Sequence, residues 1–89
     1  MSEEMRAILL VIDDCHHCDD AREKYRDAID DGKLEVERYE DYGRRRFTEL
    51  EELKVGTFPA MILEKEDGIC EIDVNSLEVK KCVQKRRYG

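Results

Sequence analysis

The segment AILLVI, residues 7–12, narrows the possible folds more than any other feature, because it is an uninterrupted apolar run in a chain with 44% charged residues. A short apolar run bounded by polar residues is typical of a strand that is buried on both faces. The chain has 89 residues, enough for one modest core. We therefore expect a single domain, residues 1–89, built around this strand.

The spacing of apolar residues predicts the elements that follow. Apolar positions between Cys18 and Ile29 recur at helical spacing, and Gly32 follows as a stop. Phe47, Leu50 and Leu53 give the stripe of a second helix. Further strands are expected from the alternating or apolar runs LEVERY, PAMILE and ICEIDV, and the EDG segment at 66–68 predicts a tight hairpin turn between the last two.

The segment after the fourth strand carries the signals of a final helix. Asn75 can cap it, and Glu78 three residues later completes a capping box. Val74 and Val79 have the spacing of a hydrophobic staple, and the buried stripe would be Val79, Cys82 and Val83.

The predicted order is therefore strand, helix, strand, helix, strand, strand, helix. A strand–helix–strand start implies a right-handed crossover and parallel pairing of the first two strands. The hairpin adds an antiparallel edge. We expect an α/β fold with a four-stranded mixed sheet (β-α-β-α-β-β-α) and helices on both faces.

The motif CHHC, Cys15 to Cys18, follows the first strand and opens the first helix. Cys15 would lie at the helix N-terminus, where unpaired N–H groups favour a thiolate. Cys18 lies three positions later, within disulfide reach. A C-x-x-C pair alone is shared by zinc and redox sites, but in this setting it indicates a redox site in which Cys15 attacks and Cys18 resolves.

With this motif and with TFP, Thr57 to Pro59, the chain resembles the thioredoxin-like superfamily, and in it the glutaredoxin-sized members. The resemblance covers nearly the whole chain in element order. It implies a thiol–disulfide oxidoreductase in which Pro59 is cis and packs beside the cysteine pair. It also implies that Thr57 and Phe58 shape the substrate groove, with the Phe58 backbone offered to an extended substrate segment.

Two departures from the glutaredoxin pattern bear on the electron donor. No lysine stands just upstream of the pair, and the segment DVNS, 73–76, occupies the place of the Gly-Gly that holds the glutathione backbone. A site for anionic glutathione should present a cation near the nucleophile, and we expect that only the cluster Arg44 to Arg46 could supply one. The expected partners are protein disulfides and a reductase or other dithiol donor, with glutathione disfavoured. No organic cofactor is implied, because the dithiol carries the electrons.

His16 and His17 are either exposed and idle or tune the pair. An imidazolium beside the thiols stabilises the reduced form, whereas the four aspartates of the segment DDCHHCDD oppose a thiolate at Cys15. The sequence leaves the net sign open.

Metal binding is the alternative function: a thioredoxin-fold metal-binding or metallochaperone module that uses the CHHC cysteines as ligands. A structural zinc site needs four ligands, usually from two spaced pairs. Cys70 and Cys82 instead lie on the apolar faces of a predicted strand and helix, so we expect buried free thiols there, or a bridge if the last helix crosses that strand. No metal site is predicted.

Charge and hydropathy limit the remaining classes. The net charge of −7 argues against nucleic-acid binding. No apolar segment approaches the roughly 20 residues of a membrane helix. The acidic start MSEEM lacks the plan of a secretory signal, so we expect a cytoplasmic monomer. The basic clusters 44–46 and 80–87 are interpreted as solvated surface.

Overall fold

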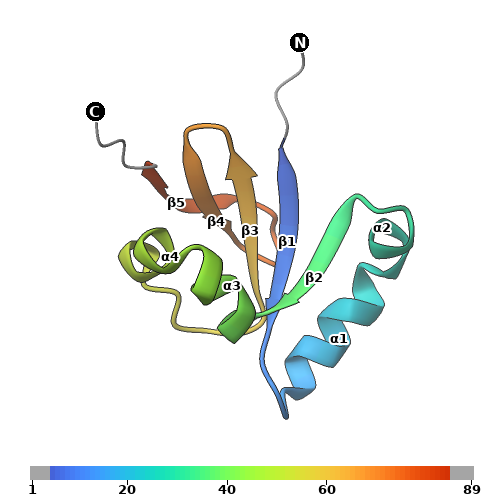
Figure 1. Ribbon diagram of the computed structural model, residues 1–89. Coiled ribbons are helices and arrows are strands. Elements are labelled where there is room, and N and C mark those ends of the chain that lie inside the picture. The colour runs from blue at the N-terminus through green and yellow to red at the C-terminus, as the bar shows by residue number, and fades with distance from the viewer. Residues whose placement is uncertain (1–4, 85–89) are drawn as a thin grey trace.

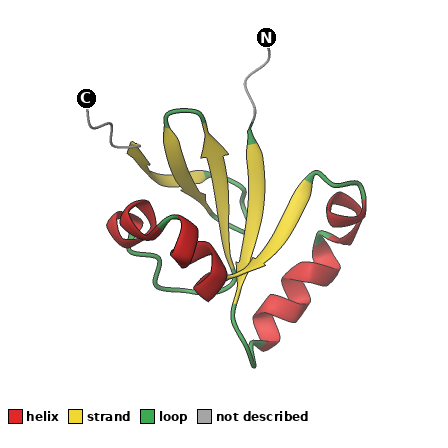
Figure 2. Cartoon of the chain, viewed as in Figure 1, coloured by secondary structure: helices red, strands yellow, loops and turns green. Residues whose placement is uncertain are grey.

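The computed structural model describes residues 5–84, which form a mixed α/β structure with a five-stranded sheet. Figure 1 shows the path of the chain, and Figure 2 separates helices from strands. In chain order the elements are β1 (Arg6–Val11), α1 (His16–Lys24), α2 (Arg26–Asp30), β2 (Leu34–Arg38), α3 (Tyr39–Arg45), α4 (Phe47–Leu53), β3 (Ala60–Lys65), β4 (Gly68–Ile72) and β5 (Val79–Gln84).

The sheet has the strand order β2-β1-β3-β4-β5. The pairing of β1 with β2 is parallel, as predicted, and the other three pairings are antiparallel. The tight turn at residues 66–67 joins β3 to β4, also as predicted. As a result, the C-terminal end of β1, the start of β3 and the end of β4 lie at the same end of the sheet, because Leu10 is opposite Ala60 and Met61 is opposite Ile72.

Helices cover both faces of the sheet, which confirms that part of the prediction (Figure 1). The central strand β1 is buried on both faces, and its alternate residues serve two apolar clusters. One cluster, with Ile8 and Leu10, packs under α3 and α4; the other, with Leu9 and Val11, packs under α1 and α2. Burial from two sides therefore explains the apolar run as far as Val11, whereas Ile12 lies beyond β1 and is exposed.

The predicted C-terminal helix is wrong: residues 79–84 form the edge strand β5, so the sheet has five strands instead of four. The residues expected to cap this helix make other contacts. The Asp73 carboxylate, not the Asn75 side chain, accepts hydrogen bonds from the backbone N–H groups of Asn75 (2.8 Å) and Ser76 (3.0 Å). Leu77 then takes a left-handed φ of 63°, which turns the chain back along β4 in place of a helix.

A helix absent from the prediction, α3, begins where the strand LEVERY was expected to end. Its Tyr42 is fully buried, and the Tyr42 hydroxyl donates a hydrogen bond of 2.7 Å to the buried carboxylate of Glu64 on β3. Burial and the Glu64 carboxylate both raise the pKa of Tyr42. Arg46 (3.6 Å) and Arg6 (3.4 Å) also lie close to Glu64, so this buried charge has compensating partners.

The first predicted helix is present but divided, because Tyr25 interrupts it between α1 and α2; Gly32 follows with a φ of 78°. Within residues 5–84, no helix is long and apolar enough to cross a membrane. The acidic start before Met5 and the basic tail after Gln84 lie outside the described residues.

Candidate active site

The Cys15–Cys18 pair lies at the N-terminus of α1 and is joined as a disulfide, with Cα atoms 5.2 Å apart. The chain leaves β1 and turns at Asp13 and Asp14, where Asp14 has a φ of 54°. Aspartate tolerates this left-handed conformation better than most residues. Cys15 follows in extended conformation as the N-cap of the helix, and its sulfur accepts the backbone N–H of Cys18 at 3.1 Å.

The two sulfur-bearing residues differ in accessibility. Cys15 is partly exposed, whereas Cys18 is 2% exposed and packs in the apolar cluster under α1. Attack by an external group is therefore easier at Cys15, and Cys18 can reach only its neighbour. The Cys15 sulfur also occupies the helix-capping position, in which N–H groups stabilise a negative charge.

The aspartates around the pair are partly compensated. Arg38, which ends β2 beside the end of β1, holds the Asp13 carboxylate at 2.8 Å. His16 lies 3.7 Å from Asp20, one helical turn away, and both side chains are largely exposed. Among residues 5–84, Asp14 and Asp19 have no ion-pair partner. The opposition of four aspartates to a thiolate is thus weaker than the sequence suggests.

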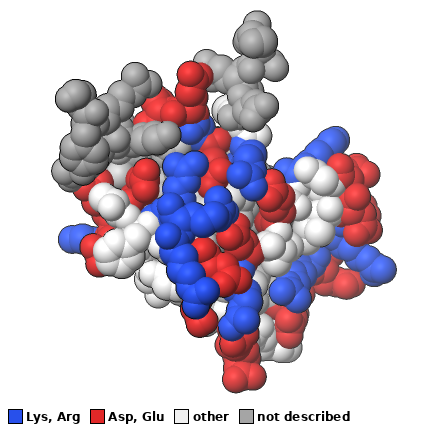
Figure 3. Space-filling view, viewed as in Figure 1, with Lys and Arg blue, Asp and Glu red and all other residues white. Residues whose placement is uncertain are grey.

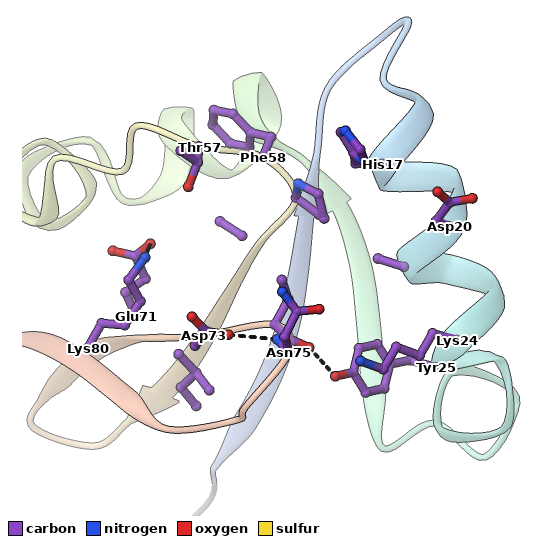
Figure 4. Close-up of a pocket in the computed structure, with 15 residues that line it drawn as sticks. His17, Asp20, Lys24, Tyr25, Thr57, Phe58, Glu71, Asp73, Asn75 and Lys80 are labelled. Atoms are coloured by element: carbon purple, nitrogen blue, oxygen red, sulfur yellow. Dashed lines mark hydrogen bonds and ion pairs between the residues drawn. The ribbon is translucent and has the colours of Figure 1, made fainter.

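A cleft of about 430 Å³ begins at His17, two residues after Cys15, and follows the end of the sheet. Figure 4 shows its walls: α1 on one side, the 57–59 segment opposite, and the 73–75 segment along the third side. Its lining residues are His17, Asp20, Ala21, Lys24, Tyr25, Thr57, Phe58, Pro59, Ala60, Glu71, Ile72, Asp73, Val74, Asn75 and Lys80.

The residues expected to shape the groove, Thr57, Phe58 and Pro59, line this cleft, and so does His17, which was expected to tune the pair or to be idle. The Phe58–Pro59 peptide bond is cis, as the resemblance implied. The Phe58 ring packs edge-on against Tyr39, with ring centroids 4.9 Å apart. His16 does not line the cleft.

The sequence did not reveal the third wall of the cleft. The Tyr25 hydroxyl donates a hydrogen bond to the carbonyl of Val74, which ties the end of α1 to the loop after β4. A β-bulge between β4 and β5 places Lys80 over Glu71, with Nζ 3.4 Å from the carboxylate. The only advance signal was the apolar spacing that put Tyr25 on the inner side of the helix. The positions of Val74 and Lys80 could not be predicted, because the segment after Val74 was expected to form a helix and instead forms a loop and the strand β5.

The basic cluster Arg44 to Arg46 lies away from the cleft, so the expectation that it alone could supply a cation is wrong. Arg45 pairs with Glu37 at 2.6 Å, and Arg46 lies near Glu49 (3.7 Å) and Glu64. The cations of the cleft are Lys24 and Lys80. Across the face in Figure 3, acidic and basic side chains are interspersed, in agreement with the interpretation of the cluster as surface.

Cys70 and Cys82 are joined as a second disulfide, so the expectation of buried free thiols is wrong. They stand opposite each other on β4 and β5, with Cα atoms 4.0 Å apart. The bridge forms between two strands and not, as the alternative supposed, between a strand and a crossing helix. Within residues 5–84, no three or more His, Cys, Asp or Glu side chains gather in a way that could hold a metal ion.

A comparison of the chain with models of protein families, with curated proteins and with solved structures finds no match.

Proposed function

We propose that this protein is a thiol–disulfide oxidoreductase with a thioredoxin-like fold, acting on protein disulfides through Cys15 and Cys18. The observation that carries the proposal is the asymmetric pair at the N-terminus of α1, beside a cleft. Cys15 is accessible and caps the helix, and Cys18 is buried within reach of it. The element order through β4 supports the fold assignment, and the edge strand β5 is a departure from the resemblance.

In the reductive direction, the Cys15 thiolate attacks one sulfur of a partner disulfide. A Cys15–partner disulfide forms, and the second partner sulfur leaves as a thiolate that takes a proton from solvent. The Cys18 thiolate then attacks the Cys15 sulfur, which forms the Cys15–Cys18 disulfide and releases the reduced partner. Two electrons pass from the protein to the partner, and the reverse sequence oxidises a partner dithiol.

The cleft supports an extended polypeptide as the substrate. It starts beside the cysteine pair, and Thr57 to Pro59 form the wall opposite α1. Its charged residues are of both signs, with Lys24 and Lys80 near Asp20, Glu71 and Asp73. A cleft with this mixed charge favours a polypeptide of mixed polarity over a compact anion.

The proposal is tested with the two single serine variants and a disulfide-containing protein substrate. Cys15→Ser is expected to abolish disulfide reduction, whereas Cys18→Ser is expected to accumulate mixed disulfides with the substrate, seen by mass spectrometry. The control, Cys70→Ala with Cys82→Ala, should retain reductase chemistry. Equal trapping by both single variants would contradict the roles, and purification with one equivalent of zinc or copper would favour the metal-binding alternative.

A matched pair of histidine variants tests the role of the cleft. His17 lines it and His16 does not, although both rings are on the first turn of α1. His17→Ala should raise the KM for a protein substrate severalfold, and His16→Ala should leave it nearly unchanged. Equal effects would contradict a binding role for the cleft.

We further propose that a protein dithiol or a flavoprotein reductase reduces this protein faster than glutathione does. In the cluster Arg44 to Arg46, which could have held the anionic tripeptide, Arg45 and Arg46 pair with carboxylates elsewhere, and Arg44 does not line the cleft. Lys24 and Lys80 share the cleft with three carboxylates, and Lys80 is paired with Glu71. NADPH-coupled assays with each donor at matched concentrations test this. Saturable reduction by glutathione that is lost in Lys24→Ala or Lys80→Ala would contradict it.

A further inference from the structure

The Cys70–Cys82 disulfide is asymmetric in the same sense as the first pair. Cys70, on β4, is 2% exposed, whereas Cys82, on the edge strand β5, is exposed. Access decides which sulfur of a disulfide an external thiolate attacks. We therefore expect an external thiolate to attack this bridge at the Cys82 sulfur.

The strand that carries Cys82 has few other side-chain attachments. Val83 is the one residue of β5 that is not exposed, and it packs against the cluster under α4. The Lys80–Glu71 ion pair adds a second contact at 3.4 Å. Because edge strands with little buried apolar surface open at low free-energy cost, the covalent bridge is the main restraint on this strand beyond its backbone pairing.

The loop between β4 and β5 connects this restraint to the cleft. Residues 73–75 form one wall, and the Val74 carbonyl accepts the hydroxyl of Tyr25 on α1. The backbone bonds from Asp73 N–H to the Glu78 carbonyl and from Leu77 N–H to the Asp73 carbonyl close the loop just before β5 begins. A change in how β5 is held therefore reaches the wall, residues 73–75, through only three intervening residues, 76–78.

We propose that Cys82 is a second site of thiol–disulfide exchange, open to external low-molecular-weight thiols such as glutathione, and that its reaction releases β5. This site is separate from the proposed chemistry of Cys15 and Cys18, and it does not depend on that chemistry.

The reaction balances with two equivalents of a monothiol. The first thiolate attacks the Cys82 sulfur, which forms a mixed disulfide there and expels Cys70 as a thiolate that takes a proton from solvent. The second thiolate attacks the added sulfur, which releases the external disulfide and leaves Cys82 reduced. The external thiols are oxidised and the Cys70–Cys82 bridge gains two electrons. Because the expelled Cys70 is buried, solvation of its thiolate favours movement of β5 away from β4.

The two cysteine pairs are too far apart to exchange directly in this structure. Cys70 is level with Leu63 and, through it, with Ala7 at the start of β1, whereas Cys15 follows the far end of β1. The four residue steps from Ala7 to Val11 alone correspond to roughly 13 Å along the strand. Electrons for Cys82 must therefore come from an external thiol.

The experiment uses the full chain with Cys15→Ala and Cys18→Ala, so that only the second bridge remains. The protein is treated with graded reduced glutathione, quenched with an alkylating reagent and mapped by mass spectrometry. The expected product carries glutathione on Cys82 and the alkyl group on Cys70. Glutathione on Cys70, or an unreacted bridge at thiol concentrations that reduce an unstructured peptide disulfide, would overturn the proposal.

Release of the strand is measured by amide hydrogen exchange on the same protein before and after reduction. Exchange at residues 79–84 should rise at least tenfold, that at 73–78 should also rise, and that of β1 and β3 should stay unchanged. The variant Cys70→Ala with Cys82→Ala, which keeps the first pair, should show the same rise without reductant. Unchanged protection at 79–84 in both proteins would refute the release of β5.

Discussion

The two cysteine pairs of this protein have the same division into an accessible and a buried partner, but different parts of the fold produce it. Cys15 and Cys18 are three residues apart, and one turn of α1 sets their separation. Cys70 and Cys82 are 12 residues apart, and the register of β4 with β5 brings them together. His17, between the cysteines of the first pair, lines the cleft, and the second pair holds the strand that follows one of its walls.

This difference assigns them different physical tasks. A bridge across one helical turn closes a very short loop and restrains the unfolded chain less than a bridge over a longer loop does, so its opening costs less stability. A bridge across a hairpin closes a longer loop and fixes an edge strand that buries little surface of its own. Under the proposed function, the first bridge opens and closes in each reaction cycle, whereas the second restrains a strand until an external thiol reduces it.

The largest expected effect is on stability under reducing conditions. Loop-closure entropy gives about 3 kcal/mol for the Cys70–Cys82 bridge and about 2 kcal/mol for Cys15–Cys18. Urea unfolding with and without a phosphine reductant should show these losses in two variants, each of which lacks one pair through alanine substitutions. A variant without any of the four cysteines, insensitive to reductant, is the control. A larger loss from the first pair would reverse the comparison.

Thiol reactivity should be greater in the first pair, although the second pair contributes more to stability. In the fully reduced protein, the Cys15 sulfur is at a helix N-terminus near the N–H of Cys18, whereas Cys82 lies on a strand. The helix terminus stabilises a thiolate, so iodoacetamide should modify Cys15 roughly tenfold faster than Cys82 at pH 6. Site-resolved mass spectrometry of timed samples measures both rates. Equal rates would show that the remaining aspartates cancel the effect of the helix.

The contrast also explains which parts of the structure the sequence could predict. The first pair, the parallel β1–β2 start and the β3–β4 turn follow from local patterns, such as the spacing of Cys15 and Cys18 and the apolar run before them. The 57–59 segment was placed by resemblance. In the cases predicted from local patterns, the deciding interactions lie within a few residues, or the spacing of apolar residues alone indicates which side chains are buried.

The second pair could not be predicted in the same way, because the segment after Val74 satisfies two local descriptions. Asn75 and Glu78 have the spacing of a capping box, yet Asp73 takes the backbone donors and Leu77 adopts a left-handed φ. Pairing with β4 then decides for a strand, and that contact is not visible in the local pattern.

Helix α3 was missed for a related reason. Tyr39 ends the segment LEVERY, which was expected to be a strand, and the burial of Tyr42 depends on Glu64, which lies 22 residues later. The spacing of Tyr39, Tyr42 and Arg46 is nevertheless that of one helix face. It could have indicated the helix.

The third prediction tests whether α1, which carries the first pair, is linked to the loop before β5, which carries Cys82 of the second. The Tyr25 hydroxyl, at the end of the helix that carries the first pair, holds the Val74 carbonyl in the loop before β5. Tyr25→Phe should lower the free energy of unfolding by about 1 kcal/mol and raise amide exchange in residues 73–78. Tyr39→Phe is the control, because within residues 5–84 the Tyr39 hydroxyl has no hydrogen-bond partner and its ring should still pack on Phe58. Equal effects of the two variants would remove the proposed link.

The smallest effect concerns Asp73, which shapes the same loop. The backbone N–H groups of Ser76 and Asn75 hold the pKa of its carboxyl below the ordinary value. A lowered folded-state pKa means that the carboxylate adds stability above the unfolded pKa of roughly 3.9, and that this stability is lost as the pH falls through the folded pKa. Asp73→Asn keeps an oxygen acceptor but not the charge. It should be slightly less stable than the parent protein at pH 7, with the difference shrinking below about pH 4.

Urea midpoints measured from pH 7 down to pH 2 test this dependence on charge. Asp67→Asn is the matched control, because Asp67 is exposed in the β3–β4 turn and has no hydrogen bond or ion pair within the described part of the chain. Its difference from the parent should stay near zero at every pH. A constant gap for Asp73→Asn across the whole range would mean that the shape of the amide, and not the lost charge, disturbs the loop. The contribution of residue 73 to the wall of the cleft would then come from the geometry of its two hydrogen bonds and not from its charge.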